Sequence, residues 1–239
     1  MGGTKNYNDK AEFDAYKDTY SKDINEAISF IGQGQDFFTK VKADYLLDII
    51  DNIQNRESPF KVLDVGCGHG LIHPYLKSRN TLIKLHGVDI AGEVIDIART
   101  NNNDVMYKTY DGNTLPYKDN DFDLVFAICV VHHVPPSERE TFFCELKRVL
   151  KPGGVLVIFE HNPLNPITLK VVNSCEMDRD AVLVRQSSLK KLLLRCGYKS
   201  SFGMFILFTP FSSYFFRWLD KLLARIPFGA QYYVVAKKS

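Results

Sequence analysis

The chain has 239 residues, of which 45% are hydrophobic and 24% charged, and its formal net charge at pH 7 is +2. This length suits one large domain or one domain with appended segments, and the composition is typical of a soluble globular protein. It excludes disordered and fibrous classes. Because the charge is nearly balanced and basic residues are interspersed with acidic ones, it gives no indication of a nucleic-acid partner.

The five cysteines are spread along the chain without the pairing of a metal site, and we interpret them as reduced thiols. No apolar run approaches the ~20 residues of a membrane span, and the amino terminus lacks an apolar signal segment. The start MGGTKN places Asn6 where a myristoylation signal needs Ser or Thr. The sequence therefore predicts a cytoplasmic protein.

Residues 1–58 are predicted to form a helical cap. An amphipathic helix is expected from Asp36, because apolar residues recur at helical spacing as far as Ile53. Aromatic residues gather in the same segment: Phe13, Tyr16, Tyr20, Phe30, Phe37 and Phe38. They fit either a lid over a cofactor or the packing of a helix, and Tyr20 is the residue that we expect in a lid contact.

From residue 59 onward, short apolar runs alternate with helical stretches. The runs occupy 60–65, 82–88, 122–128 and 153–159, with a weaker one at 104–109, and helices are predicted near 70–78, 91–101 and 137–150. Strands that alternate with helices predict a doubly wound, mostly parallel sheet in the α/β class, with helices on both faces. The stretch LKPGG, Leu150–Gly154, is expected to end a helix and start the next strand.

The last third of the chain is predicted to complete the same core, residues 59–239, with substrate-side insertions near 161–186 and 209–229. We expect a helix at 188–196, a strand at 198–208, a helix at 213–226 and a final strand at 231–236. The helix at 213–226 carries Phe215, Trp218 and Leu222 on one side and basic residues on another. This pattern fits a helix at a membrane surface or lipid substrate, although a helix packed on the domain is the commoner case.

The stretch VLDVGCGHG, Val62–Gly70, follows the first predicted strand with three glycines in five positions. At the carboxyl end of a parallel strand, such a turn presents free backbone N–H groups to a ligand. The dinucleotide fingerprint G-x-G-x-x-G/A places its third small residue at Leu71, so this loop fits a diphosphate poorly. Asp64, beside the loop, would repel phosphate and attract an ammonium group.

Two more carboxylates follow the next strands. Asp89 ends the second strand, where an acidic residue can accept hydrogen bonds from both hydroxyls of a ribose. Asp111, followed by Gly112, comes after the third strand and can accept from the exocyclic amine of adenine. An amino-acid head, a ribose and an adenine without phosphates together describe S-adenosylmethionine.

The motifs VLDVGCGHG, GVDI, YDGNTLPYKDNDFDLVF, VVHHV and LKRVLKPGG resemble those of class I S-adenosylmethionine-dependent methyltransferases, in the group with quinone-biosynthesis and small-molecule enzymes. The resemblance covers roughly residues 60–160. It implies a Rossmann-like sheet of seven strands with the last one antiparallel, and S-adenosylhomocysteine as the product. It assigns cofactor binding to Asp64, Gly66, Cys67, Gly68, Gly70, Asp89, Ile90, Asp111, Gly112, Ile128 and Cys129.

Catalytic candidates follow the fourth and fifth strands. His132 and His133 come after the fourth strand, and Glu160 ends the fifth with His161 next to it. Each of them fits a proton acceptor or a substrate contact, and each also fits an ordinary polar strand end. Zinc binding by His132, His133 and His161 agrees with residue type, but no ligand spacing supports it, so we expect no metal.

The predicted function is methyl transfer from S-adenosylmethionine to a small-molecule acceptor, for which an apolar or lipid-linked compound is one interpretation. A non-catalytic S-adenosylmethionine-binding scaffold or regulatory module is the alternative. Asp89 and Asp111 argue against it, because a scaffold would not need them. A nucleotide-dependent oxidoreductase is disfavoured by Leu71 and Asp64.

Overall fold

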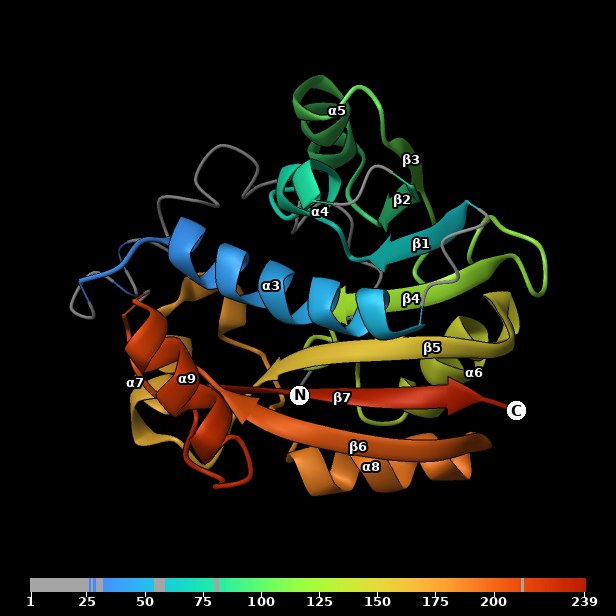
Figure 1. Cartoon of the computed structure of the whole chain (residues 1–239). Coiled ribbons are helices and arrows are strands. Elements are labelled where there is room, and N and C mark those ends of the chain that lie inside the picture. Colours follow the sequence, from blue (N-terminus) through green and yellow to red (C-terminus); the bar gives the residue numbers. More distant parts are fainter. Residues whose placement is uncertain (1–25, 27, 29–31, 54–58, 80–81, 212) are drawn as a thin grey trace, which may run out of the picture.

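The computed structural model describes residues 26, 28, 32–53, 59–79, 82–211 and 213–239. Seven strands in these ranges form one mixed sheet in the order β3-β2-β1-β4-β5-β7-β6 (Figure 1). The strands are β1 (Phe60–Val65), β2 (Ile83–Asp89), β3 (Met106–Thr109), β4 (Phe122–Ile128), β5 (Leu150–His161), β6 (Tyr198–Ile206) and β7 (Gln231–Lys238). Strands β1 to β5 pair in parallel, whereas β7 runs antiparallel to both β5 and β6. The predicted sheet and its antiparallel last strand are confirmed.

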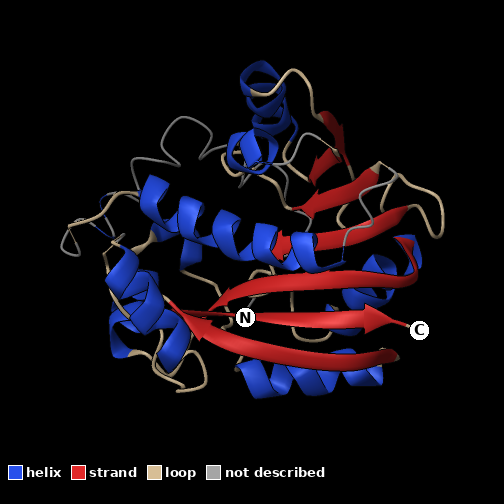
Figure 2. Ribbon diagram, viewed as in Figure 1, coloured by secondary structure: helices blue, strands red, loops and turns tan. Residues whose placement is uncertain are grey.

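Helices cover both faces of the sheet (Figure 2). One face packs against α3 (Gln35–Ile53), α4 (His73–Arg79) and α5 (Gly92–Asn101), and the other against α6 (Arg139–Val149) and α8 (Gln186–Arg195). Two further helices, α7 (Pro166–Ser174) and α9 (Tyr214–Leu223), lie beyond the carboxyl ends of β4 and β5 (Figure 1). None of the helices in the described ranges is long and apolar enough to cross a bilayer.

The central strands read as continuous apolar runs because both of their faces are buried. In β1, Leu63 and Val65 belong to the core beneath α6 and α8, whereas Val62 belongs to the core beneath α3. Successive side chains of a strand point to opposite faces, so a strand covered on both sides needs an apolar residue at nearly every position.

Helix α3 is part of the main core. Leu46, Leu47 and Ile50 on α3 are fully buried in the same cluster as Phe126 and Phe159 of the sheet. The helix that we expected in the cap therefore packs directly on the sheet. Tyr20, the predicted lid residue, lies outside the described residues.

The stretch LKPGG follows α6 directly and forms the beginning of β5, so it starts the strand as expected. Leu150 pairs with Phe122 of β4, and the register then shifts before Leu124 pairs with Val155. Gly153 adopts φ = +76° within this interval, so the Pro-Gly-Gly segment forms an irregularity inside the strand.

Candidate active site

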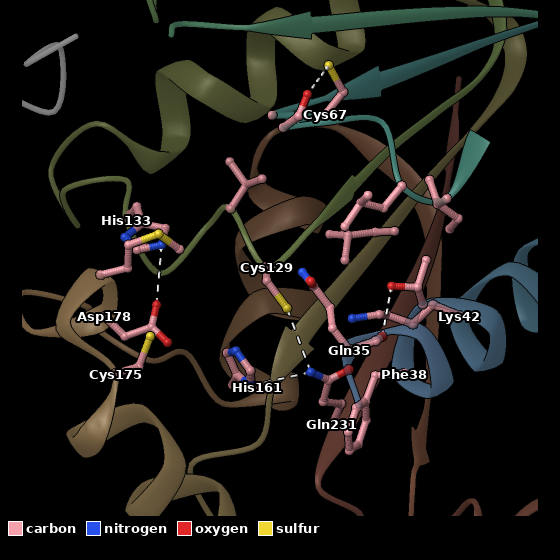
Figure 3. Close-up of a pocket in the computed structure, with 18 of the residues that line it drawn as sticks. Gln35, Phe38, Lys42, Cys67, Cys129, His133, His161, Cys175, Asp178 and Gln231 are labelled. Carbon is pink, nitrogen blue, oxygen red and sulfur yellow. Dashed lines mark hydrogen bonds and ion pairs between the residues drawn. The ribbon is translucent and has the colours of Figure 1, made fainter. Parts of the chain in front are cut away.

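A cavity of about 280 Å³ opens at the carboxyl ends of β1, β2 and β4, which is where the parallel-sheet argument places a ligand. Helix α3 and the segment around α7 supply its other walls. Figure 3 shows how side chains from these separate elements converge on one space. The chain thus brings the predicted glycine loop together with residues that the sequence alone could not assign to it.

All three glycines of the loop adopt positive φ, with values of +72° at Gly66, +51° at Gly68 and +67° at Gly70. A Cβ on Gly66 would lie 2.5 Å from Cγ2 of Val130, and Gly66 and Gly68 both line the cavity. Gly70 is not among the lining residues, and a Cβ there would collide with the Tyr107 hydroxyl. Two of the glycines therefore face the ligand space, and the third permits close packing.

Asp64 presents a carboxylate oxygen to this cavity from the end of β1. Its Oδ2 lies 3.0 Å from Nε2 of His73, and the other ring nitrogen of His73 bonds the Tyr107 hydroxyl. The second oxygen, Oδ1, is buried and has no hydrogen-bond partner in the described part of the chain. Burial raises the pKa of Asp64. A buried carboxylate oxygen without a donor is suited to an ammonium group of a ligand.

Asp89 is held rigidly at the end of β2. Its Oδ2 accepts the Gly68 N–H at 2.9 Å, and its Oδ1 accepts the Ala91 N–H at 3.0 Å. Asp89 and Ile90 line the cavity beside Tyr110, which the sequence analysis did not select. In the sequence, Tyr110 stands out only as an aromatic residue directly after the third strand. The carboxylate that ties the glycine loop to β2 thus also borders the ligand space.

Asp111 and Gly112 lie away from the main cavity. Oδ1 of Asp111 accepts the N–H groups of Asn113 at 2.9 Å and Thr114 at 2.7 Å, so this exposed carboxylate closes its own turn. Gly112 lines a separate, smaller cavity next to α6. Neither Asp111 nor Gly112 is among the residues that line the main cavity, and the expected adenine contact at Asp111 stays a prediction.

The end of β4 contributes Ile128 and Cys129 to the cavity, as expected. Cys129 adopts φ = +57°, and its sulfur accepts a hydrogen bond from Nε2 of Gln231, 3.7 Å away. Burial raises the pKa of the Cys129 thiol and that of Cys67, which also lines the cavity. Both thiols are therefore protonated at neutral pH and are not activated nucleophiles.

Of the three catalytic candidates, one lines the cavity and the other two form a buried pair. His133 lines the cavity, whereas neither His132 nor Glu160 is among the lining residues. Oε1 of Glu160 accepts the Val131 N–H at 2.7 Å, and Oε2 lies 2.6 Å from Nδ1 of His132. Although burial opposes it, His132 lowers the pKa of Glu160. Glu160 is 1% exposed and is bonded to the loop after β4, so the structure offers no substrate contact for its side chain, and its catalytic role stays a prediction.

Asp178 joins this cluster from a short 3-10 turn at Glu176–Asp178. Its Oδ1 lies 3.3 Å from Nε2 of His132. The same oxygen lies 3.5 Å from Nε2 of His133 (Figure 3). Burial lowers the pKa of His133 to about 3 and that of His161 to about 4, so both rings are neutral at pH 7. Asp178 lies in an irregular segment 45 residues after His133. No motif in that segment indicates a contact with the two histidines.

The opposite end of the cavity carries a buried cation. Lys42 of α3 is 9% exposed, and no acceptor for its ammonium group is found within the described ranges. Figure 3 shows it pointing into the same space as Gln35, Cys129 and Gln231. Much of the remaining wall beside α3 and α7 is apolar, from Phe38, Ile167, Val171 and Leu207. This end can take a ligand with an apolar body and an oxygen-rich or anionic group.

Comparison with known families gives a match between residues 63–158 and a model described as a methyltransferase domain. Among curated proteins, the "Probable tRNA methyltransferase 9B" of Mus musculus is 34% identical over 124 residues, which cover 52% of this chain and 26% of that protein. The phosphoethanolamine N-methyltransferase of Plasmodium falciparum is 25% identical over 131 residues, 54% of this chain and 48% of that protein. The chain thus spans only about a quarter to a half of these relatives.

Solved structures share the fold over nearly the whole chain. A Thermotoga maritima protein described as a SAM-dependent methyltransferase, possible histamine N-methyltransferase, superposes with a TM-score of 0.67 at 18% identity. That match covers 95% of this chain and 98% of the other. Phosphoethanolamine N-methyltransferase 2 of Haemonchus contortus, solved with S-adenosyl-L-methionine, gives 0.67 at 19% identity and covers 99% of this chain and 60% of that one.

Proposed function

We propose that residues 63–158, which match a model described as a methyltransferase domain, form a class I S-adenosylmethionine-dependent methyltransferase domain, and that the protein transfers the methyl group of S-adenosylmethionine to a small-molecule acceptor. The observation that carries the proposal is a single cavity that is lined by the glycine loop, Asp64 and Asp89, and also by Lys42 and His133. Donor and acceptor can therefore meet in one cavity.

The glycine loop and the ends of β1 and β2 suit the cofactor. The unpartnered Oδ1 of Asp64 would receive the ammonium group of its methionine part, and Gly66 and Gly68 would allow its close approach to the backbone. Asp89 would bind the ribose hydroxyls, with Ile90 and Tyr110 beside the adenine. The bound cofactor supplies an electrophilic methyl group on a positively charged sulfur.

The walls formed by α3 and α7 suit an acceptor with an apolar body and a polar group. Phe38, Ile167 and Val171 would pack against the body, while Lys42 would pair with an anionic or oxygen-rich substituent. A lipid-linked acceptor agrees with this wall and with the exposed apolar side chains of α9 nearby, among them Phe215 and Leu222. A tRNA, the substrate class in the name of one relative, would have to insert a single nucleotide into this cavity of about 280 Å³, whereas a small molecule can enter it whole.

The residues of this chain would position the acceptor and exclude water from the cavity. Holding an acceptor atom in line with the methyl group replaces a bimolecular encounter and can lower the barrier by about 7–11 kcal/mol. His133, neutral at pH 7, can accept a hydrogen bond from an acceptor hydroxyl or amine. His132 and Glu160 do not reach the cavity and are positioning residues for the loop that carries His133.

The test is a transfer assay with methyl-labelled S-adenosylmethionine and an acceptor panel that contains phenols, amines, carboxylates, lipid-linked quinols and tRNA. The proposal predicts label in a small molecule and release of S-adenosylhomocysteine. Cofactor binding without turnover on any acceptor would favour the scaffold alternative. Label confined to tRNA would overturn the assignment of the acceptor class.

A further inference from the structure

We propose that His132, His133 and Asp178 form a binding site for one divalent transition-metal ion, of the zinc type, in the wall of the cavity. The three side chains come from the loop after β4 and from the 3-10 turn at Glu176–Asp178, and so from distant parts of the sequence. The inference concerns metal binding itself and does not depend on methyl transfer.

The spacing of the ligand atoms is that of a metal site. Nε2 of His132, Nε2 of His133 and an oxygen of Asp178 all lie within 4.8 Å of one another, with the two contacts to Asp178 at 3.3 and 3.5 Å. Ligands at bond lengths of ~2.0–2.2 Å in a tetrahedral arrangement are roughly 3.3–3.5 Å apart. The site can therefore accept an ion with small side-chain adjustments.

The hydrogen bonding of His132 points to a cation in this position. Its Nδ1 lies 2.6 Å from a carboxylate oxygen of Glu160, so Nδ1 carries the proton and donates it. In the neutral ring, Nε2 then holds a lone pair, yet it faces Oδ1 of Asp178 at 3.3 Å and makes no hydrogen bond within the described chain. Two electron-rich atoms that face each other in a buried site require a positive charge between them.

Glu160 supplies the partner that histidine ligands of metals usually have. A carboxylate that accepts the proton of the outer ring nitrogen fixes the tautomer and makes the other nitrogen a better ligand. Glu160 is itself held by the Val131 N–H at 2.7 Å. This arrangement explains why a fully buried carboxylate and a fully buried histidine are paired behind the cavity wall.

The positive charge could instead be a second proton on His132, and this is the main competing account. A second proton on His132, together with the Nε2–H tautomer of a neutral His133, would serve both contacts to Asp178, as an ion would, so metal binding has to be measured to decide between the two. With three protein ligands, an ion keeps at least one open position. Because His133 and Asp178 line the cavity, that position would face it and could take an oxygen or nitrogen of a small ligand.

The experiment measures metal binding to the full chain after treatment with a chelator. Zinc is titrated by calorimetry, and cobalt(II) is then added to record the visible absorption of the ion and any near-ultraviolet sulfur-to-cobalt band. The variants are Asp178→Asn and, as a matched control, Asp180→Asn, which makes the same charge change at an exposed residue two positions away. S-adenosylhomocysteine binding by each variant reports whether the fold and the cofactor end of the cavity are intact.

The proposal predicts one zinc ion per chain, a loss of affinity of at least about tenfold in Asp178→Asn, and no comparable loss in Asp180→Asn. The cobalt spectrum should show nitrogen and oxygen ligands without a sulfur band. Absence of saturable binding, equal affinity in the two variants, or a sulfur band from the nearby Cys175 would each overturn it. The first of these outcomes would assign the charge to a protonated His132, and none of them would affect the test of methyl transfer.

Discussion

At the scale of single residues, Asp64 and Asp89 hold similar positions at strand ends but have different partners. Both oxygens of Asp89 accept backbone N–H groups, so its carboxylate fixes the glycine loop to the end of β2. Among the described residues, only Oδ2 of Asp64 has a hydrogen-bond partner, and Asp64 lines the cavity. Asp89 therefore combines a structural and a binding role, whereas the free oxygen of Asp64 is best explained by a ligand.

The glycine loop allows a matched test of close approach. Gly66→Ala places a methyl group 2.5 Å from Val130 at φ = +72°, whereas Gly32→Ala introduces the same backbone strain at φ = +74° with no atom of the described residues within 4 Å. We expect Gly32→Ala to cost about 1–2 kcal/mol, the strain alone, and Gly66→Ala to cost more. Urea unfolding measures the two costs. Equal costs would show that close packing at Gly66 contributes nothing.

His86 makes stability depend on pH. Its ring packs edge-on against Phe122 and Tyr117, and neither ring nitrogen has a hydrogen-bond partner in the described structure. Burial lowers the pKa of His86 from 6.5 to about 4. Between these values the unfolded chain binds a proton that the folded chain does not. This contribution to the free energy of unfolding is therefore complete above pH 6.5 and falls as the pH decreases toward 4.

Replacing His86 by Phe should reduce this pH dependence. Urea unfolding at several pH values between 4 and 7 compares the variant with the wild type. We expect a smaller decrease in the free energy of unfolding below pH 6.5 for His86→Phe, with an apolar ring left in the same aromatic cluster. Identical slopes would mean that His86 titrates normally in the folded protein.

At the scale of elements, the sequence predicts strands well and their tertiary neighbours poorly. The runs at 60–65 and 122–128 coincide with β1 and β4, because a strand buried on both faces needs continuous apolar residues. The loops after β1 and β2 could be assigned to a site because parallel strands end at one edge of the sheet.

Other site residues depend on packing that no local pattern encodes. Lys42 looks like a surface residue of an amphipathic helix until α3 is placed across the sheet, and Asp178 lies on a short 3-10 turn. Asp111 carries the right chemistry for a cofactor contact, but its side chain is used by its own turn. Glu160 ends a strand near the site, yet it is turned inward to His132.

Helix α9 shows an unusual distribution of burial that can be tested. Leu222 is 64% exposed and Trp218 53%, whereas Asp220 is fully buried and its Oδ1 accepts the N–H and the hydroxyl of Thr209 at 3.2 and 3.3 Å. We expect Leu222→Ser to change the free energy of unfolding by less than about 0.5 kcal/mol. Asp220→Ala should cost about 1–3 kcal/mol, because it leaves two donors of the half-buried Thr209 unpaired.

Urea unfolding of both α9 variants provides the measurement. A similar cost for the two would show that the outer face of α9 is covered by another part of the protein, and would remove its support for an apolar acceptor. The expected difference would leave that face available to solvent, a lipid or a substrate. A role at a membrane surface stays a prediction.

At the scale of the whole molecule, two hydrophobic cores on opposite faces of the sheet fix the relative positions of the strand ends. The cavity draws residues from both sides, since Ile90 and Tyr110 belong to one core and Cys67 and Ile72 to the other. Its glycine loop and Asp89 are therefore held by the packing of the entire fold. This rigidity suits a site that must align two reactants.

The central claim is that this cavity binds S-adenosylmethionine through the residues at the ends of β1 and β2. Calorimetry with S-adenosylhomocysteine and with NAD tests it on the wild type, Asp89→Ala and Asp111→Asn. We expect S-adenosylhomocysteine and not NAD to bind the wild type, with a loss of about tenfold or more in Asp89→Ala and little change in Asp111→Asn. Unchanged affinity in Asp89→Ala, or preferential binding of NAD, would contradict the account.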